Sequence, residues 1–349
     1  MQSIENRKVS NSCSLLEAMK LMDKLGTKTL FVFDGEKFLG LLTIGDIQRA
    51  IINNIDINSA VGGVLSAKKI YAKETDSIGK IKKMMSSIRS ECMPVVSEDG
   101  DLVSVYFWKD LFGVHEEPKR EKLDLPVVIM AGGFGTRLKP LTNVIPKPLI
   151  PLGDKTILEE IMDQFEKIGT SKFYMSVNYK YDMIEFYLNQ LEHKYDISFF
   201  RESKPLGTIG SVSLLKDKIN TPFFVSNCDI IIDQDYRDVY EYHKNNGNDI
   251  TIVTAVMNYN IPYGVIETKE DGVMVGLSEK PNIAYKINTG VYILQPELIN
   301  EIPEDTFFHI THLMEKVVAR GGKVGCFPVS ENSWTDIGDW NEYLKIIRK

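Results

Sequence analysis

Cysteine is scarce in this chain: only four cysteines occur among 349 residues, and they are scattered. Neither a CxxC pair nor a dense cysteine framework is present, which excludes a disulfide scaffold and argues against a zinc site. We therefore expect Cys13, Cys92, Cys228 and Cys326 to be reduced thiols of a cytoplasmic protein.

Long apolar runs and basic clusters are also missing. No stretch approaches the roughly 20 apolar residues that span a bilayer, and the first 14 residues are polar, so we expect no membrane partner. The net charge is −7 and neither half carries a long basic run, which argues against binding of nucleic acid. Any phosphate site should therefore be small and local.

The length of 349 residues predicts two domains. The first third contains a repeat, because residues 14–50 can be aligned with residues 78–112. Each copy predicts a helix, two strands joined by an Asp-Gly turn, and a second helix. The charged, proline-containing run 115–125 predicts a linker, with a boundary near residues 119–122. The expected domains are residues 1–118 and 123–349.

The repeat resembles a tandem pair of cystathionine-β-synthase-type (CBS) domains, an α+β fold, over roughly residues 1–115. Residues 40–46 match the stretch that contacts ligands in that family. The resemblance implies that Thr43 binds the phosphate and Asp46 the ribose of an adenine nucleotide. The second copy has Phe107 and Asp110 at these positions, so we expect at most one nucleotide per pair. A purely structural role in a homo-oligomer is the alternative.

Residues 125–349 alternate between strand and helix patterns, which predicts a Rossmann-like α/β domain with a mostly parallel sheet. The strand candidates are residues 125–131, 172–177, 197–200, 223–227 and 250–256, and the helix candidates are residues 157–169, 183–191, 211–215 and 236–245. Such sheets bind ligands beyond the carboxyl ends of their strands.

A glycine-rich loop follows the first strand of this domain and extends from Ala131 to Gly153. Glycines at 132, 133 and 135 allow the backbone N–H groups to approach phosphate oxygens, and Arg137 and Lys147 add positive charge. The Walker pattern is excluded because no Gly-Lys-Ser/Thr follows. The dinucleotide fingerprint is excluded because Leu138 occupies the place of its third glycine, which argues against a dehydrogenase. The loop predicts a polyphosphate site.

This loop resembles the signature of the sugar-1-phosphate nucleotidyltransferases, GG-x-G-T-R-L-x-P-L-T followed by P-K-P. The resemblance implies that Arg137 and Lys147 act on the triphosphate and that Lys280, in an EKP motif, holds the sugar phosphate. It implies metal ligands at Asp229 and at Asp336 of a W-x-D-I-G motif. The implied substrate-binding residues are Ala131, Gly132, Gly133, Gly135, Thr136, Glu202, Leu206, Gly207, Thr208, Asn227, Glu279, Asn288 and Gly290.

The implied reaction needs no general base, because the attacking sugar phosphate is already ionised at neutral pH. Two aspartates with phosphate oxygens and water suit Mg²⁺, the expected cofactor. His309 and His312 lack a third ligand nearby and are expected on a partly exposed helix face.

The order of the domains is similar to that of the glucosamine-1-phosphate guanylyltransferases of bacterial legionaminic acid biosynthesis, which implies GTP and glucosamine 1-phosphate as substrates. Mannose-1-phosphate guanylyltransferases, thymidylyl and cytidylyl transferases, and a non-catalytic nucleotide-sensing protein are the alternatives.

Overall fold

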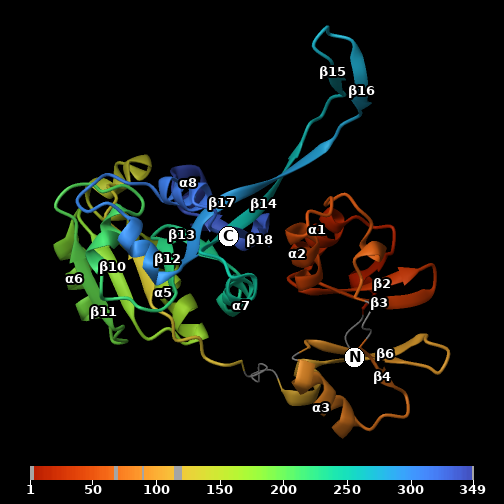
Figure 1. Cartoon of the computed structure of the whole chain (residues 1–349). Coiled ribbons are helices and arrows are strands. Elements are labelled where there is room, and N and C mark those ends of the chain that lie inside the picture. Colours follow the sequence, from red (N-terminus) through yellow and green to blue (C-terminus); the bar gives the residue numbers. More distant parts are fainter. Residues whose placement is uncertain (1–3, 67–69, 89, 114–119, 348–349) are drawn as a thin grey trace. The chain divides into compact units, whose positions relative to one another are not determined.

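The computed structural model describes residues 4–66, 70–88, 90–113 and 120–347, in two compact units (Figure 1). Unit 1 is Met1–Glu121 and unit 2 is Lys122–Lys349. Residues 114–119 lie outside the described residues, and they include residues 115–119 of the predicted linker.

Unit 1 contains the predicted repeat, and its α+β character is confirmed. Each copy forms a three-stranded sheet, with strand orders β1-β2-β3 and β4-β5-β6. The two sheets share an apolar core that includes Phe31, Phe38, Cys92 and Phe107. The elements of unit 1 are β1 (Lys8–Ser10), α1 (Leu15–Leu25), β2 (Thr29–Asp34), β3 (Lys37–Thr43), α2 (Ile44–Ile52), β4 (Ala72–Lys73), α3 (Ile78–Ile88), β5 (Cys92–Val96), β6 (Leu102–Phe107) and α4 (Trp108–Phe112).

Local sequence signals fix the ends of helix α1. The Ser14 hydroxyl accepts from the backbone N–H of Glu17, and the Glu17 carboxylate accepts from the backbone N–H of Ser14, so a capping box starts the helix. Gly26 ends it with φ of 58°, a left-handed conformation that glycine adopts at little cost.

Unit 2 is built on a seven-stranded sheet with the order β11-β10-β7-β12-β17-β14-β18. All neighbouring strands are parallel except at β17, which is antiparallel to both β12 and β14, so the mostly parallel sheet is confirmed. The strands are β7 (Val127–Met130), β10 (Phe173–Val177), β11 (Ile197–Arg201), β12 (Phe223–Asn227), β14 (Ile250–Asn260), β17 (Asn282–Leu294) and β18 (Val324–Ser330).

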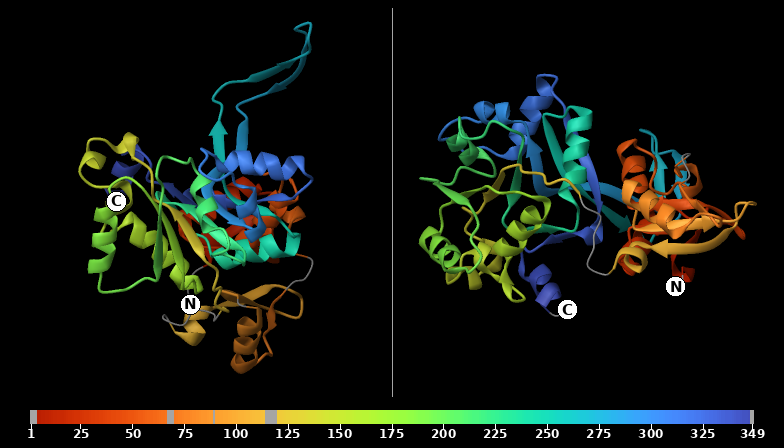
Figure 2. Two further views of the ribbon diagram at one scale, coloured as in Figure 1. Left: turned by 60° about the vertical axis from the view of Figure 1, so that its left-hand side comes forward. Right: turned by 90° about the horizontal axis from the view of Figure 1, so that it is seen from below.

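Helices cover the sheet and enclose two apolar cores (Figure 2). The helices are α5 (Ile157–Ile168), α6 (Tyr181–Gln190), α7 (Tyr236–Asn246), α8 (Ile310–Ala319) and α9 (Trp340–Ile347). The predicted helix at residues 211–215 is a 3₁₀ helix, Gly210–Leu215. The N–H groups of Ile209 and Gly210 both donate to the carbonyl of Phe308, and this external contact fixes the start of the segment.

A β-hairpin leaves this sheet where β14 passes into β17 (Figure 1). Its outer part is a separate two-stranded sheet of β15 (Val265–Thr268) and β16 (Met274–Ser278). We call residues 259–285 the arm. The sequence did not predict it.

Candidate active site

The glycine-rich loop follows β7 and folds into three short 3₁₀ turns, Thr136–Leu138, Leu141–Asn143 and Lys147–Leu149. The Thr142 hydroxyl donates to the Gly135 carbonyl at 2.9 Å and closes the loop on itself. Gly135 has φ of 62°, and a Cβ there would lie 2.8 Å from the Thr142 methyl group and 3.1 Å from Lys147 Cβ. Only glycine fits this position, which brings Lys147 beside the loop.

Strand β12 is the parallel neighbour of β7, and Asp229 follows its carboxyl end. A short antiparallel pair, β13 (Ile230–Ile232) with β19 (Trp334–Asp336), sets Asp336 opposite Ile230. The N–H of Ile337 donates to the Asp229 carbonyl at 2.9 Å. Two segments that are distant in the sequence therefore bring the predicted aspartates together.

Positive charges border these carboxylates. The buried side chains of Lys147 and Asp229 form an ion pair. A Cβ on Gly338 would lie 2.5 Å from Asp336 Oδ1 and 2.8 Å from Arg137 Nη2, so Arg137 and Asp336 meet at a glycine. Of the predicted residues, the structure thus brings Arg137, Lys147, Asp229 and Asp336 into one cluster.

One oxygen of the Asp336 carboxylate, Oδ1, is buried without a hydrogen-bond partner among the described residues. Burial raises the pKa of Asp336, and the neighbouring Asp229 charge raises it further, while Lys147, Arg137 and the backbone N–H of Gly338 oppose both effects. A buried carboxylate oxygen without a donor is costly to the fold, and a bound cation would relieve that cost.

The donor set fits a hard divalent cation that keeps several non-protein ligands. The described residues contain no group of three or more His, Cys, Asp or Glu side chains that could hold a metal. Two carboxylates alone suit Mg²⁺, which binds through one or two carboxylates plus phosphate oxygens and water.

The predicted substrate-binding residues Leu206, Gly207 and Thr208 form a loop, here called the base loop. Two elements hold it: Glu202, itself a predicted substrate-binding residue, and the segment 306–309. The buried Glu202 carboxylate accepts from the Ser176 hydroxyl at 2.6 Å and from the Leu206 N–H at 3.2 Å. Its Oε1 would lie 3.1 Å from a Cβ on Gly132, so Glu202 lies directly behind the phosphate loop. Glu202 therefore links the two loops, and its carboxylate is occupied by protein donors.

The second element is the segment 306–309, before helix α8. Phe308 donates its N–H to the Leu206 carbonyl at 2.9 Å. Gly207 has φ of 83°, and a Cβ there would lie 2.6 Å from the Phe308 carbonyl oxygen. Thr208 Oγ1 accepts from the Ile310 N–H at 2.9 Å and lies 3.4 Å from His309 Nδ1. His309, half-buried, is thus the N-cap of α8 beside the base loop, and His312, exposed, lies in the first turn of α8, as expected for a partly exposed helix face.

The predicted sugar-side residues fall into two groups. Gly290 donates its N–H to Asn288 Oδ1 at 3.0 Å, and a Cβ on Gly290 would lie 2.5 Å from Asn227 Nδ2, so these three residues lie together. Glu279 and Lys280 are exposed at the base of the arm, where Lys280 Nζ lies 3.9 Å from Glu279 Oε1. Lys280 is therefore not part of the buried ion pair of Lys147 and Asp229. Ala131 is buried, and Gly133 and Thr136 are exposed in the phosphate loop.

In unit 1, the predicted ligand residues bind each other. Thr43 and Asp46 form the capping box of α2, and Arg49 pairs with the Asp46 carboxylate. In the second copy, Phe107 caps α4 without a side-chain hydrogen bond.

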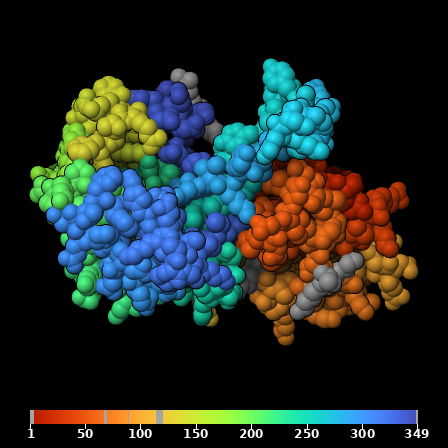
Figure 3. Space-filling view, turned by 45° about the horizontal axis from the view of Figure 1, so that its top comes forward, coloured from red at the N-terminus to blue at the C-terminus, as the bar shows by residue number. Residues whose placement is uncertain are grey.

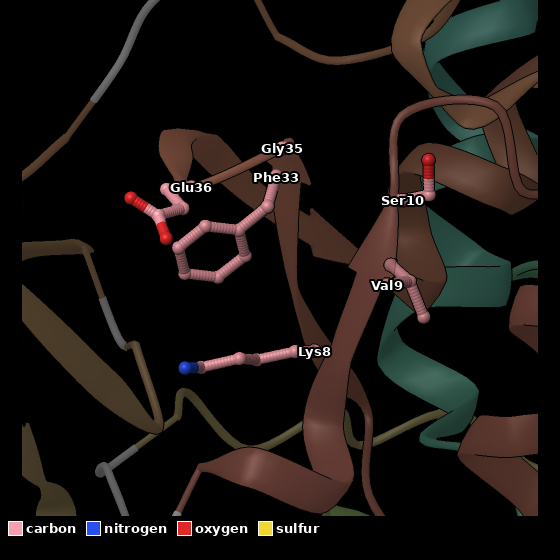
Figure 4. A pocket seen from close by; sticks show the side chains of 6 residues that line it. All are labelled: Lys8, Val9, Ser10, Phe33, Gly35 and Glu36. Carbon is pink, nitrogen blue, oxygen red and sulfur yellow. The ribbon is translucent and has the colours of Figure 1, made fainter.

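A hollow of about 460 Å³ lies elsewhere in the first copy, and Figure 4 shows Lys8, Phe33 and Glu36 pointing to one side of it. No helix of the described residues is long and apolar enough to cross a membrane.

Comparison with known proteins covers both units. Residues 126–349 match the nucleotidyl transferase family, and residues 7–53 match the CBS domain. A mannose-1-phosphate guanylyltransferase catalytic subunit beta of Dictyostelium discoideum is 35% identical over 228 residues, which are 63% of this chain and 63% of that protein. Mannose-1-phosphate guanylyltransferase 1 of Arabidopsis thaliana is 30% identical over 64% of each chain.

Solved structures give the same picture for unit 2. The crystal structure of HddC from Yersinia pseudotuberculosis is 28% identical with a TM-score of 0.51, over 64% of this chain and 98% of that chain. The inositol-1-phosphate CTP transferase from T. maritima, at 18% identity and a TM-score of 0.50, covers 66% of this chain and 97% of that chain and shares the fold.

Proposed function

This chain belongs to the nucleotidyl transferase family, and we propose that it transfers a guanylyl group from GTP to a hexose 1-phosphate, releasing pyrophosphate. The cluster of Lys147, Asp229 and Asp336 beside the glycine-rich loop carries the proposal, because it provides both signs of charge where phosphates would meet. The relatives that are mannose-1-phosphate guanylyltransferases support GTP and favour mannose 1-phosphate over glucosamine 1-phosphate.

In this reaction an oxygen of the sugar phosphate attacks the α-phosphorus of GTP, and the bond between that phosphorus and the bridging oxygen of pyrophosphate breaks. The protein needs to position the two anions and offset their repulsion. Arg137, exposed at the rim, would bind the triphosphate, and Lys147 would contact the phosphoryl group being transferred. Lys280 on the arm would hold the sugar phosphate.

Asp229 and Asp336 would hold Mg²⁺, which supplies positive charge to the phosphoryl oxygens when it is bound. The unpartnered Oδ1 of Asp336 supports this assignment. The loop residues 206–208, held by Glu202 and Phe308, would contact the nucleoside.

The test is pyrophosphate release by the full chain with each of four nucleoside triphosphates against a panel of hexose 1-phosphates. We expect GTP with mannose 1-phosphate to give the highest kcat/KM. A different best pair would replace the substrate assignment. No pyrophosphate with any pair would favour a non-catalytic nucleotide-sensing protein, and activity retained by Asp229→Asn and Asp336→Asn would remove the metal assignment.

We also propose that unit 1 binds at most one adenine nucleotide, at Thr43 and Asp46. The capping box keeps both side chains at the start of α2, and the second copy lacks the equivalent hydroxyl. Calorimetric titration of AMP, ADP and ATP into the full chain tests this, with Asp110→Ala as the matched control. Binding that survives Asp46→Ala but not Asp110→Ala would reverse the assignment, and no binding would leave a structural role.

A further inference from the structure

Helix α9 is attached to the glycine-rich loop through two aromatic side chains. The Trp340 indole donates its Nε1–H to the Lys139 carbonyl at 2.7 Å, and the Tyr343 hydroxyl donates to the Pro151 carbonyl at 3.1 Å. Lys139 directly follows the first turn of the loop, and Pro151 lies near its carboxyl end. Figure 3 shows the atoms of the loop (yellow) against those of the C-terminal segment (dark blue). One helix therefore holds the loop at two separate points.

The sequence around α9 sets the direction of these two side chains. Trp340 and Tyr343 lie three residues apart, so both project from the same face of the helix. Their rings are in contact, with centroids 6.1 Å apart. Asp339 fixes the start of the helix, because its Oδ1 accepts the N–H groups of Asn341 and Glu342 at 2.9 and 3.1 Å.

The residues just before α9 are attached to the two aspartates of the candidate site. Ile337 is fully buried and donates its N–H to the Asp229 carbonyl at 2.9 Å. Gly338 is the glycine at which Asp336 and Arg137 meet. We call residues 336–343 the clamp. The clamp thus carries one aspartate, is bonded to the other, and touches the arginine of the loop.

The position of the loop relative to the aspartates matters for the reaction proposed above, and this inference rests on that proposed function. A Mg²⁺ ion binds oxygen at about 2.1 Å, so a triphosphate on the loop and a cation at the aspartates need a fixed separation. A glycine-rich backbone has unusual conformational freedom and needs outside support to keep such a separation. We propose that Trp340 and Tyr343 are positioning residues, which hold the glycine-rich loop at the correct place relative to Asp229 and Asp336.

Calorimetric titration of GTP into the full chain, once with Mg²⁺ and once with EDTA, tests this proposal. Trp340→Phe keeps an aromatic ring but loses the N–H, and Tyr343→Phe loses only the hydroxyl. Each variant should bind GTP about fivefold more weakly in Mg²⁺, the effect of one lost hydrogen bond. Binding in EDTA should change by less than about twofold, because the triphosphate connects the loop to the aspartates only through the cation. In turnover, the KM for GTP should rise while the KM for the sugar phosphate stays constant.

Trp108→Phe, in unit 1, and Tyr195→Phe, which removes a half-buried hydroxyl that donates to Asp163, are the matched controls. Both should bind GTP like the wild type. Equal losses in Mg²⁺ and EDTA would mean that the aromatic pair only stabilises the loop, and unchanged binding in Mg²⁺ would remove the pair from the site. Either result would overturn this inference alone, whereas a wild type that binds no GTP would overturn it together with the proposed function.

Discussion

His243 should make the stability of unit 2 depend on pH. The imidazole is 1% exposed, between α7 and the sheet. The Gln295 amide donates to its Nε2 at 3.1 Å, so Nε2 is the acceptor and Nδ1 carries the proton that is donated to Thr251 Oγ1 at 2.9 Å. A second proton on Nε2 would face the N–H of Gln295. Burial lowers the pKa of His243 from 6.5 to about 4, although Asp249 acts in the opposite direction.

The pKa difference sets the size and direction of the effect. Because the folded protein disfavours the charged form, the stabilisation is complete above pH 6.5 and is lost as pH falls from 6.5 to about 4. At 1.36 kcal/mol per pKa unit, the loss is about 3 kcal/mol over that range. Asp336 acts in the opposite sense, because its raised pKa favours the neutral form and adds stability at low pH.

Urea unfolding at several pH values measures this loss. A Trp108→Phe background leaves Trp334 and Trp340, both in unit 2, as the fluorescent reporters. His243→Asn retains a donor toward Thr251 but does not titrate, so it should lower stability at neutral pH and flatten its decline below pH 6.5. Asp336 contributes equally to both proteins and cancels in the comparison. His193→Gln, at an exposed histidine, is the control. An equal decline in His243→Asn and the wild type would refute the reasoning.

Three further predictions concern the site. Asp336→Asn removes a charge that burial and Asp229 disfavour, so it should raise the free energy of unfolding in urea by about 1 kcal/mol. Pyrophosphate release should fall by orders of magnitude, and a fall in both quantities would contradict this. Lys147→Met leaves Asp229 buried without its partner and should lower the free energy of unfolding in urea by about 3–5 kcal/mol. The control Lys155→Met breaks an exposed pair with Asp163 and should lower it little. Equal losses would contradict a stabilising role of the buried pair. Gly207→Ala should raise the KM for GTP more than the KM for the sugar phosphate, because the new Cβ would collide with Phe308. The control Gly272→Ala, also at positive φ but in open space, should leave the KM for GTP unchanged. An equal rise in the KM for GTP in both variants would exclude the contact with Phe308 as the cause.

The elements that sequence predicted best are those whose signals are local. The repeat in unit 1 follows from periodic helices ending at Gly26 and from Asp-Gly turns, all of which act within a few residues. The parallel strands of unit 2 follow from short apolar runs between helices. The arm could not be found this way. A strand pattern in Ile250–Asn260 does not reveal that its outer half leaves the sheet, because that depends on which strands are available to pair with it.

In the site, motif order supplied the candidate residues, but spacing could not show their contacts. Glu202 is predicted to bind substrate, and the structure shows that its carboxylate accepts hydrogen bonds from Ser176 and Leu206, which the sequence did not predict. The contact of Phe308 with Leu206 joins residues about a hundred positions apart, and it consists of backbone bonds that carry no side-chain signal. The glycines at 207 and 210 were the one available clue, because close backbone approach requires the absence of Cβ.

The ion pair of Lys147 and Asp229 bears on how substrates would enter. In the reaction proposed above, Lys147 would not neutralise a transferred phosphoryl group while it neutralises Asp229. Asp229 would not hold a cation while its charge is offset by Lys147. With Mg²⁺ held by Asp229 as proposed, Lys147 would be released from the carboxylate and would be available to the phosphate, so metal and nucleotide would bind together. A buried charge without a partner is unfavourable. Release of Asp229 by Lys147 would therefore be favourable only when a cation binds Asp229 and a phosphate binds Lys147. The two ligands would then bind with positive coupling, and the coupling must be the same in both directions. Without ligands, the Lys147 charge offsets that of Asp229, which reduces the repulsion between Asp229 and Asp336.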